Sequence, residues 1–75
     1  MTADRLTDLL VARLVRDHGQ SKHHWRKVIG PIRIYSRETH AHCNWASTPT
    51  GSLNDVAAIE TLLDDLRMRH PLIGR

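Results

Sequence analysis

The apolar positions of residues 3–18 recur at intervals of three and four, the spacing of one face of an α-helix. The stripe consists of Leu6, Leu9, Leu10 and Leu14. Thr2 can cap the first turn, and Gly19 follows the last turn, where glycine often ends a helix. This pattern predicts an amphipathic helix over residues 3–18.

A second stripe with helical spacing follows "PTGS" and contains Val56, Ile59, Leu62, Leu63 and Leu66. Ser52 can cap its start, and Asp55 three positions later gives a shorter version of the capping box. Pro71 prevents the helix from continuing beyond about His70, since proline lacks the backbone N–H that a helix needs. The sequence therefore predicts a helix over about residues 53–70.

Between these helices the pattern changes to a period of two, which is typical of strands. In "PIRIYSR" the isoleucines share one face and Arg33, Tyr35 and Arg37 share the other. "HCNWAST" supplies a partner strand, and the polar "SRETHA" supplies the connection. The sequence predicts two antiparallel strands, or three if "HHWRKVI" forms another before a bend at Gly30-Pro31.

The predicted order is helix, two or three antiparallel strands, helix. Two amphipathic helices can bury their stripes by covering one face of the sheet together. A chain of 75 residues allows one hydrophobic core. We therefore predict a single small two-layer α+β domain over residues 1–75.

If the apolar face of the strands meets the helices, the other face gathers polar side chains. That face would hold Arg33, Tyr35, Arg37, His42 and Asn44. Arginines can pair with phosphates while a tyrosine ring stacks on an exposed base. An ordinary solvated outer face explains the same pattern equally well. With one tyrosine and no phenylalanine, the aromatic platform is too thin to favour sequence-specific stacking.

Charge is concentrated in the middle of the chain. Residues 18–42 hold five Lys or Arg residues against Glu38 alone, in a chain whose net charge is +3. A basic segment between near-neutral helices favours an anionic partner, either nucleic acid or an acidic protein surface. The candidate binding residues are Lys22, Trp25, Arg26, Lys27, Arg33, Tyr35, Arg37 and His42. Trp25 would anchor an interface if exposed and would belong to the core if buried.

The run "RETHAHCNW" brings two histidines close to the single cysteine. A structural zinc site needs four converging ligands, usually as two close pairs, and this spacing matches no such pattern. Strand alternation also places His40 and His42 on the face opposite Cys43. We interpret Cys43 as a small core residue and expect no metal or cofactor, with a zinc-binding domain completed by His23 and His24 as an alternative.

Catalytic patterns are not found in the sequence. In a strand His42 points away from Cys43 and cannot activate it as a base, and "VIGPI" is not a Gly-rich phosphate loop. Asp64 and Asp65 are adjacent on a predicted helix, where neighbouring side chains diverge. We expect a protein that is not an enzyme.

The start of the chain carries Asp4, Asp8 and Asp17 instead of the uncharged stretch of a signal peptide. The longest apolar run, Leu9 to Ala12, is far shorter than the ~20 residues that cross a bilayer. A single cysteine cannot form an intramolecular disulfide. These features predict a cytoplasmic protein without a membrane partner.

Two resemblances follow from these motifs. The order α-β-β-β-α, if the third strand forms, resembles the double-stranded-RNA-binding domain in topology, although that family has basic residues where this chain has the acidic "SLNDVAAIE". The runs "WRKVIGPIRIYS", "HCNW", "PTGS" and "HPLI", within about residues 22–73, resemble short alphaproteobacterial proteins of unknown function. This second resemblance implies a bacterial cytoplasmic origin and no particular activity.

Two further partners are compatible with a small domain that lacks catalytic residues. One is another protein, for which the chain would act as an adaptor or inhibitor, as phage-borne inhibitors of bacterial defence nucleases do. The other is a second copy of the chain, since a sheet of two or three strands leaves unpaired backbone groups at its edge and can form a homodimer there.

Overall fold

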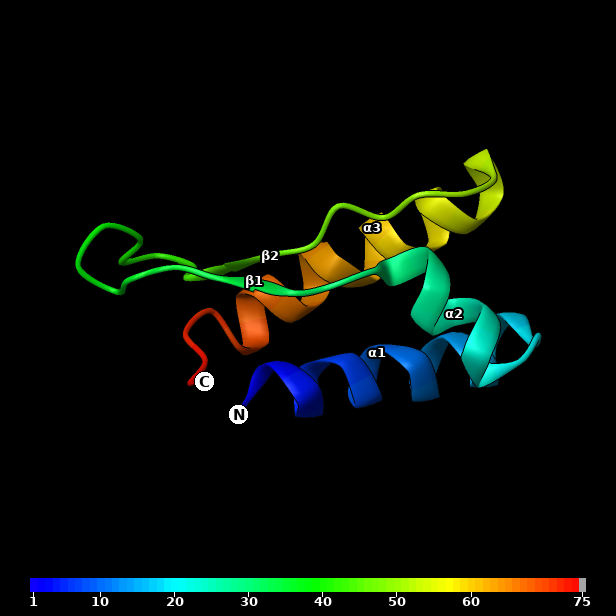
Figure 1. Cartoon of the computed structure of the whole chain (residues 1–75), viewed down its shortest axis with the longest axis horizontal. Helices are drawn as coiled ribbons and strands as arrows, with labels where there is room; N and C mark the ends of the chain where they lie inside the picture. Colours follow the sequence, from blue (N-terminus) through cyan, green and yellow to red (C-terminus); the bar gives the residue numbers. More distant parts are fainter. Residues whose placement is uncertain (75) are drawn as a thin grey trace.

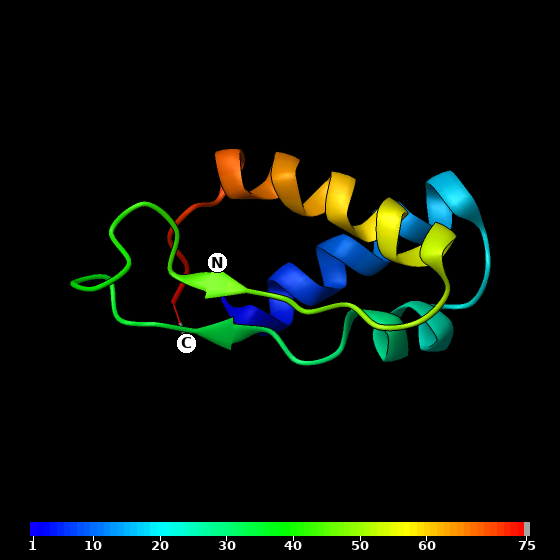
Figure 2. The same ribbon diagram turned by 90° about the horizontal axis from the view of Figure 1, so that it is seen from above.

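The computed structural model describes residues 1–74, which form three helices and a two-stranded antiparallel sheet (Figure 1). The helices are α1 (Ala3–His18), α2 (Lys22–Ile29) and α3 (Leu53–Arg69), and the strands are β1 (Arg33–Ile34) and β2 (Trp45–Ala46). In Figure 1 α1 lies below the hairpin, and Figure 2 shows β2 between β1 and α3. The α+β prediction is confirmed.

The first helix has the predicted boundaries because both ends are capped as the sequence indicated. The Thr2 side chain accepts a hydrogen bond from the backbone N of Arg5 at 3.2 Å. At the other end Gly19 has a φ of 76° and its N–H donates to the Val15 carbonyl at 2.9 Å. A positive φ here suits glycine, which has no Cβ to clash with the backbone.

The prediction of a third strand in "HHWRKVI" is wrong, because these residues form α2. The Ser21 side chain caps the helix by accepting from the backbone N of His24 at 3.0 Å. The buried residues Trp25, Val28 and Ile29 are separated by three and one, which is helical spacing. The observed order α-α-β-β-α also differs from the order on which the likeness to the double-stranded-RNA-binding domain rested.

The core receives side chains from every part of the fold. Its fully buried members include Leu6, Leu10 and Leu14 of α1, Trp25 and Ile29 of α2, Ile59, Leu63 and Leu66 of α3, and Ile73 of the C-terminal segment. Ile32, Ile34 and Cys43 are half-buried and pack against this cluster, as the sequence predicted for the inner face of the hairpin. The Cys43 thiol lies 3.4 Å from the carbonyl oxygen of Trp45, to which it can donate.

The hairpin is shorter than the alternating pattern indicated. Arg33 pairs with Ala46 and Ile34 with Trp45, and the N–H of Tyr35 donates to the Asn44 carbonyl at 2.7 Å. Beyond Tyr35 the chain leaves the sheet and forms the exposed loop of residues 36–42. Regular pairing therefore extends over only the part of the hairpin that packs on the core.

Asn44 is not on the open face with His42 as predicted, since it is only 2% exposed. Its backbone N–H donates to the Pro71 carbonyl at 3.0 Å. Its side chain donates from Nδ2 to the Ile73 carbonyl and accepts at Oδ1 from the Ile73 N–H, both at 2.8 Å. The segment after α3 thus covers the side chain, which alternation within the hairpin alone would leave in water.

The C-terminal segment is held from both sides. Trp45 Nε1 donates to the His70 carbonyl at 2.8 Å on the side of the hairpin. On the other side Thr2 and Gly74 form a parallel bridge, and the Gly74 N–H donates to the Met1 carbonyl at 2.7 Å. The two ends of the chain consequently lie side by side (Figures 1 and 2).

The segment between β2 and α3 is fastened to the end of α2. The Ser47 hydroxyl donates to the Ile29 carbonyl at 3.1 Å, and the Thr50 N–H donates to the Val28 carbonyl at 2.9 Å. These bonds satisfy carbonyls that the last turn of a helix leaves without partners. They also fix the path that leads the chain back to α3.

Truncating a leucine in the middle of either stripe should strongly destabilise the domain. Leu10→Ala and Leu63→Ala should each lower the free energy of unfolding by about 2–5 kcal/mol, because both leucines are fully buried and their removal leaves a cavity. Urea denaturation measures the effect. Leu53→Ala is the control, since that side chain is 88% exposed, and a loss equal to that of the core variants would contradict the assigned core.

Removing the Asn44 amide should lower the free energy of unfolding by more than the loss of so small a side chain suggests. Asn44→Ala leaves the N–H and C=O of Ile73 buried without a partner, at about 1–3 kcal/mol for each group. Urea denaturation should show this loss, whereas the exposed Asn54→Ala should change stability by less than about 0.5 kcal/mol. Equal midpoints for the two variants would show that the buried bonds contribute little.

Candidate partner-binding surface

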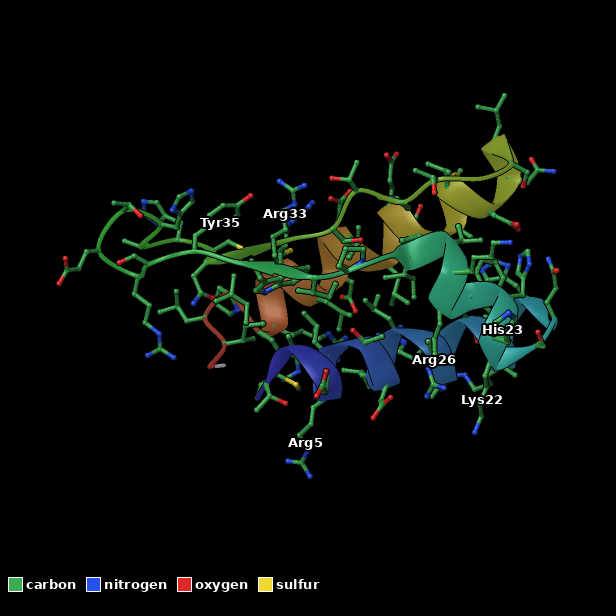
Figure 3. The ribbon with its side chains drawn as sticks, viewed as in Figure 1. Arg5, Lys22, His23, Arg26, Arg33 and Tyr35 are labelled. Atoms are coloured by element: carbon green, nitrogen blue, oxygen red, sulfur yellow. The ribbon has the colours of Figure 1, made fainter. Side chains whose placement is uncertain are left out.

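Five exposed side chains of the hairpin and its loop form what we call the hairpin surface: Arg33, Tyr35, Arg37, His40 and His42. In Figure 3 Arg33 and Tyr35 both point upward, away from α1. They share this direction because they are two residues apart in an extended strand whose intervening residue, Ile34, packs on the core. Arg33 and Tyr35 therefore share an open face, as the alternation predicted, whereas Arg37 and His42, which were predicted on the same face, lie in the loop outside the strands.

An aromatic stack gives the hairpin surface a fixed feature. The rings of Tyr35 and His40 lie with centroids 4.4 Å apart and planes inclined by 19°. The loop brings them together through a turn in which the His40 N–H donates to the Ser36 carbonyl at 2.9 Å. The Thr39 hydroxyl lies 2.9 Å from His40 Nδ1, within hydrogen-bond distance. The sequence analysis placed Tyr35 on this surface but gave no indication that His40 would stack on it.

Five of the six helix arginines are ion-paired within residues 1–74, Arg5 of α1 being the exception, whereas the two arginines of the hairpin are not. Within residues 1–74, salt bridges to aspartate involve Arg13, Arg16, Arg26, Arg67 and Arg69. Neither Arg33 nor Arg37 takes part in a salt bridge in this part of the chain, although Glu38 lies in the same loop. Their guanidinium groups keep all their donors available for a ligand.

The predicted binding residues of α2 lie elsewhere. Lys22 and Arg26 point downward in Figure 3 with Arg5 of α1, opposite to Arg33 and Tyr35. Arg26 is also 3.3 Å from Asp8 of α1, which offsets part of its charge. Lys27 is exposed on the same helix. The structure thus divides the basic middle of the sequence between two surfaces instead of one.

Trp25 belongs to the core and cannot anchor a partner. It is 1% exposed, and its Nε1 donates to the Gly19 carbonyl at 2.7 Å. This bond fixes the turn between α1 and α2, and the ring of His24 packs edge-on at 5.1 Å. Of the two alternatives that the sequence left open for Trp25, burial is the one observed.

A groove that the sequence did not indicate lies between α1 and α3, with a volume of about 250 Å³. Leu14, Ala58 and Leu62 supply its apolar part, while Arg13 and Asp65 pair across it at 3.0 Å. Small-molecule sites usually exceed ~300 Å³ and place unpaired polar groups around a ligand. Arg13 and Asp65 already pair with each other, so neither charge is free for a ligand in this groove.

The histidines and the cysteine do not converge. Within the described residues 1–74 no three His, Cys, Asp or Glu side chains are grouped so that they could hold a metal ion. His40 stacks on Tyr35, Cys43 points to the Trp45 carbonyl, and His24 lies 2.8 Å from Asp55 of α3. This arrangement gives the alternative of a zinc-binding domain no ligand set.

Among residues 1–74, no helix combines the length and the apolar composition that crossing a bilayer requires. Comparison of the chain with protein-family models, with curated proteins and with solved structures returns no match. The function must therefore be argued from the surfaces themselves.

Acid should weaken the contact between α1 and α3. The Arg13 guanidinium beside Asp65 holds the pKa of that carboxyl below its usual range; partial burial opposes the shift and Arg69 adds to it. A lowered folded-state pKa gives stability that is complete above the unfolded pKa of about 3.9 and is lost as the pH falls through the folded value.

Asp65→Asn tests this linkage. The wild type should be more stable than the variant at about pH 6, and the difference should shrink as the pH falls below about 4. Thermal melts over this range measure it, with Glu60→Gln as a control because Glu60 has no salt bridge within residues 1–74. A difference that is constant with pH would contradict the assignment.

Proposed function

We propose that this chain is a non-enzymatic binding module that uses the hairpin surface to bind an anionic partner, nucleic acid. The observation that supports the proposal is the pairing pattern of the arginines. Arginines on the helices are mostly balanced by aspartates, whereas Arg33 and Arg37 have no salt-bridge partner within residues 1–74. A cationic group without an internal partner can take an external phosphate without first breaking an ion pair.

The arrangement of the hairpin surface suggests how such a ligand would bind. Arg33 and Arg37 would pair with successive phosphates of a single strand, since guanidinium groups match phosphate geometry. The Tyr35–His40 stack would receive an unpaired base on the ring face that is left free, and Tyr35 is 37% exposed. This mode reads the backbone and one base, so it predicts little sequence preference.

The size of the surface favours single-stranded over duplex ligands. Lys22 and Arg26 point to the opposite side of the molecule (Figure 3), so they would not contact a strand that lies on the hairpin surface. An extended strand needs only a narrow track of cations and a stacking ring. A duplex would instead need phosphate contacts across a groove.

An acidic protein surface could use the same arginines, in which case the chain would be an adaptor or inhibitor. The feature that would have favoured this alternative is an exposed Trp25, and Trp25 is buried. We therefore place nucleic acid first. With a single cysteine, which needs no oxidising compartment, a cytoplasmic location is part of the proposal.

Removing the two unpaired arginines should weaken binding without unfolding the domain. For Arg33→Ala with Arg37→Ala, each lost phosphate contact should reduce the slope of log affinity against log salt by about 0.7 for a single strand. Fluorescence anisotropy with labelled single-stranded and duplex oligonucleotides over a salt series measures the slope. Both side chains are exposed, so the melting temperature should stay that of the wild type.

The matched control removes the same charge elsewhere. Arg16→Ala with Arg69→Ala deletes two exposed arginines of α1 and α3 that are paired with aspartates. This variant should retain most of the affinity. Equal loss in both variants would show that only net charge matters, and unchanged binding in the hairpin variant would reject the hairpin surface as the site. Binding to an acidic protein but to no oligonucleotide would favour the adaptor.

A further inference from the structure

The outer edge of β1 carries backbone groups that the fold leaves unused. The sheet has two strands, so β1 has a neighbouring strand on one side only. Figure 2 shows β1 on the outer side of the hairpin, with α1 and α3 both on the other side of it. On the side of β2, the neighbouring residue Asn44 is already bonded to the C-terminal segment through its backbone N–H.

The direction of one hydrogen bond shows which groups face outward. The Tyr35 N–H donates to the Asn44 carbonyl, so the backbone groups of Tyr35 point toward β2. Because these groups alternate along a strand, those of Ile32 and Ile34 point away from β2. Pro31, which has no N–H, falls at a position that points inward. The backbone N–H and C=O groups of Ile32 and Ile34 therefore face outward along this edge.

We propose that a second copy of this chain pairs antiparallel with this edge, about a two-fold axis at Ile34. The N–H and C=O of Ile34 would then bond to the same groups of the partner subunit's Ile34. The product is a continuous four-stranded sheet in the order β2, β1, partner β1, partner β2. This proposal goes beyond the proposed function and does not depend on it.

Charge selects this register from its neighbours. With the axis at Ile34, Arg33 lies opposite Tyr35 of the partner subunit, a pairing without like-charge repulsion. An axis at Arg33 would place two arginines directly opposite each other, and an axis at Tyr35 would place Arg33 opposite the partner subunit's Arg37. Like charges in such cross-strand positions are destabilising. Of these three registers, only the one with its axis at Ile34 avoids placing arginines opposite each other.

The same pairing would join the two hairpin surfaces. A two-fold axis perpendicular to the sheet keeps the outer faces on one side, so Arg33 and Tyr35 of both copies would lie on a single basic face. The edge is short, and an interface of this size gives a weak dimer that dissociates on dilution. Association should therefore become visible only at high protein concentration.

Two single-cysteine proteins test the register. Arg33→Cys and Tyr35→Cys are each made with Cys43→Ala, which removes the only native thiol. In the proposed register position 33 faces position 35 of the other copy at about 4.5 Å between Cα atoms, within disulfide reach. Position 33 lies about 7–8 Å from its own counterpart, at the limit of that reach.

An equimolar mixture of the two proteins, oxidised with glutathione disulfide, should give several-fold more cross-linked dimer than either protein alone. Asn54→Cys, also with Cys43→Ala, measures cross-linking by random collision. The register would be wrong if Arg33→Cys alone, or Tyr35→Cys alone, gave more cross-linked dimer than the mixture. Sedimentation of the wild type should show mass rising toward that of a dimer with concentration, and a monomer at every concentration would overturn the pairing. No ligand is present, so the result is independent of nucleic-acid binding.

Discussion

The hydrogen bonds between the Asn44 amide and the backbone of Ile73 connect the parts of the fold that are furthest apart in sequence. They hold the C-terminal segment against β2, and that segment in turn bridges to Thr2 at the start of α1. A primary amide can satisfy both groups of one peptide residue because it has a donor and an acceptor side by side. Ile73 itself is thereby fixed in the core beside the long helices. In a domain this small, few other contacts join the hairpin, the C-terminal segment and the start of α1.

This closure also determines where the molecule can interact. Next to β2, Asn44 is bonded to the C-terminal segment, whereas β1 has a neighbouring strand on one side only. The inner face of the hairpin packs on the core, and its outer face carries Arg33 and Tyr35. The β1 edge and the outer face of the hairpin are adjacent. A dimer formed at the edge would therefore bring two outer faces together into one larger surface. A ligand that spans both copies would strengthen the weak pairing by binding only the paired state.

The pairing of charges differs between the helices and the hairpin. On the helices, five arginines have aspartate partners one, three or four residues away or on another helix, whereas Arg5 has none within residues 1–74. Such exposed pairs contribute little stability and do not by themselves favour a ligand. The hairpin loop contains Glu38 but no aspartate, and its Arg37 is exposed, as is Arg33 of β1. Binding here would rest on few contacts, so we expect modest affinity that falls steeply with salt. The stack of Tyr35 on His40 supplies the one preordered element of this surface.

The sequence by itself determined α1, α3 and the hairpin, because their periods and caps are local properties of the chain. It also placed Arg33 and Tyr35 on one face, since alternation fixes relative direction within a strand. It did not determine α2, where eight residues are too few for a period to be unambiguous, although Ser21 and the spacing of Trp25, Val28 and Ile29 carried the signal. Only the tertiary structure decided the burial of Asn44 and Trp25 and the separation of Lys22 from Arg33. Each depends on which distant segment covers a side chain, and local periodicity contains no information about that contact.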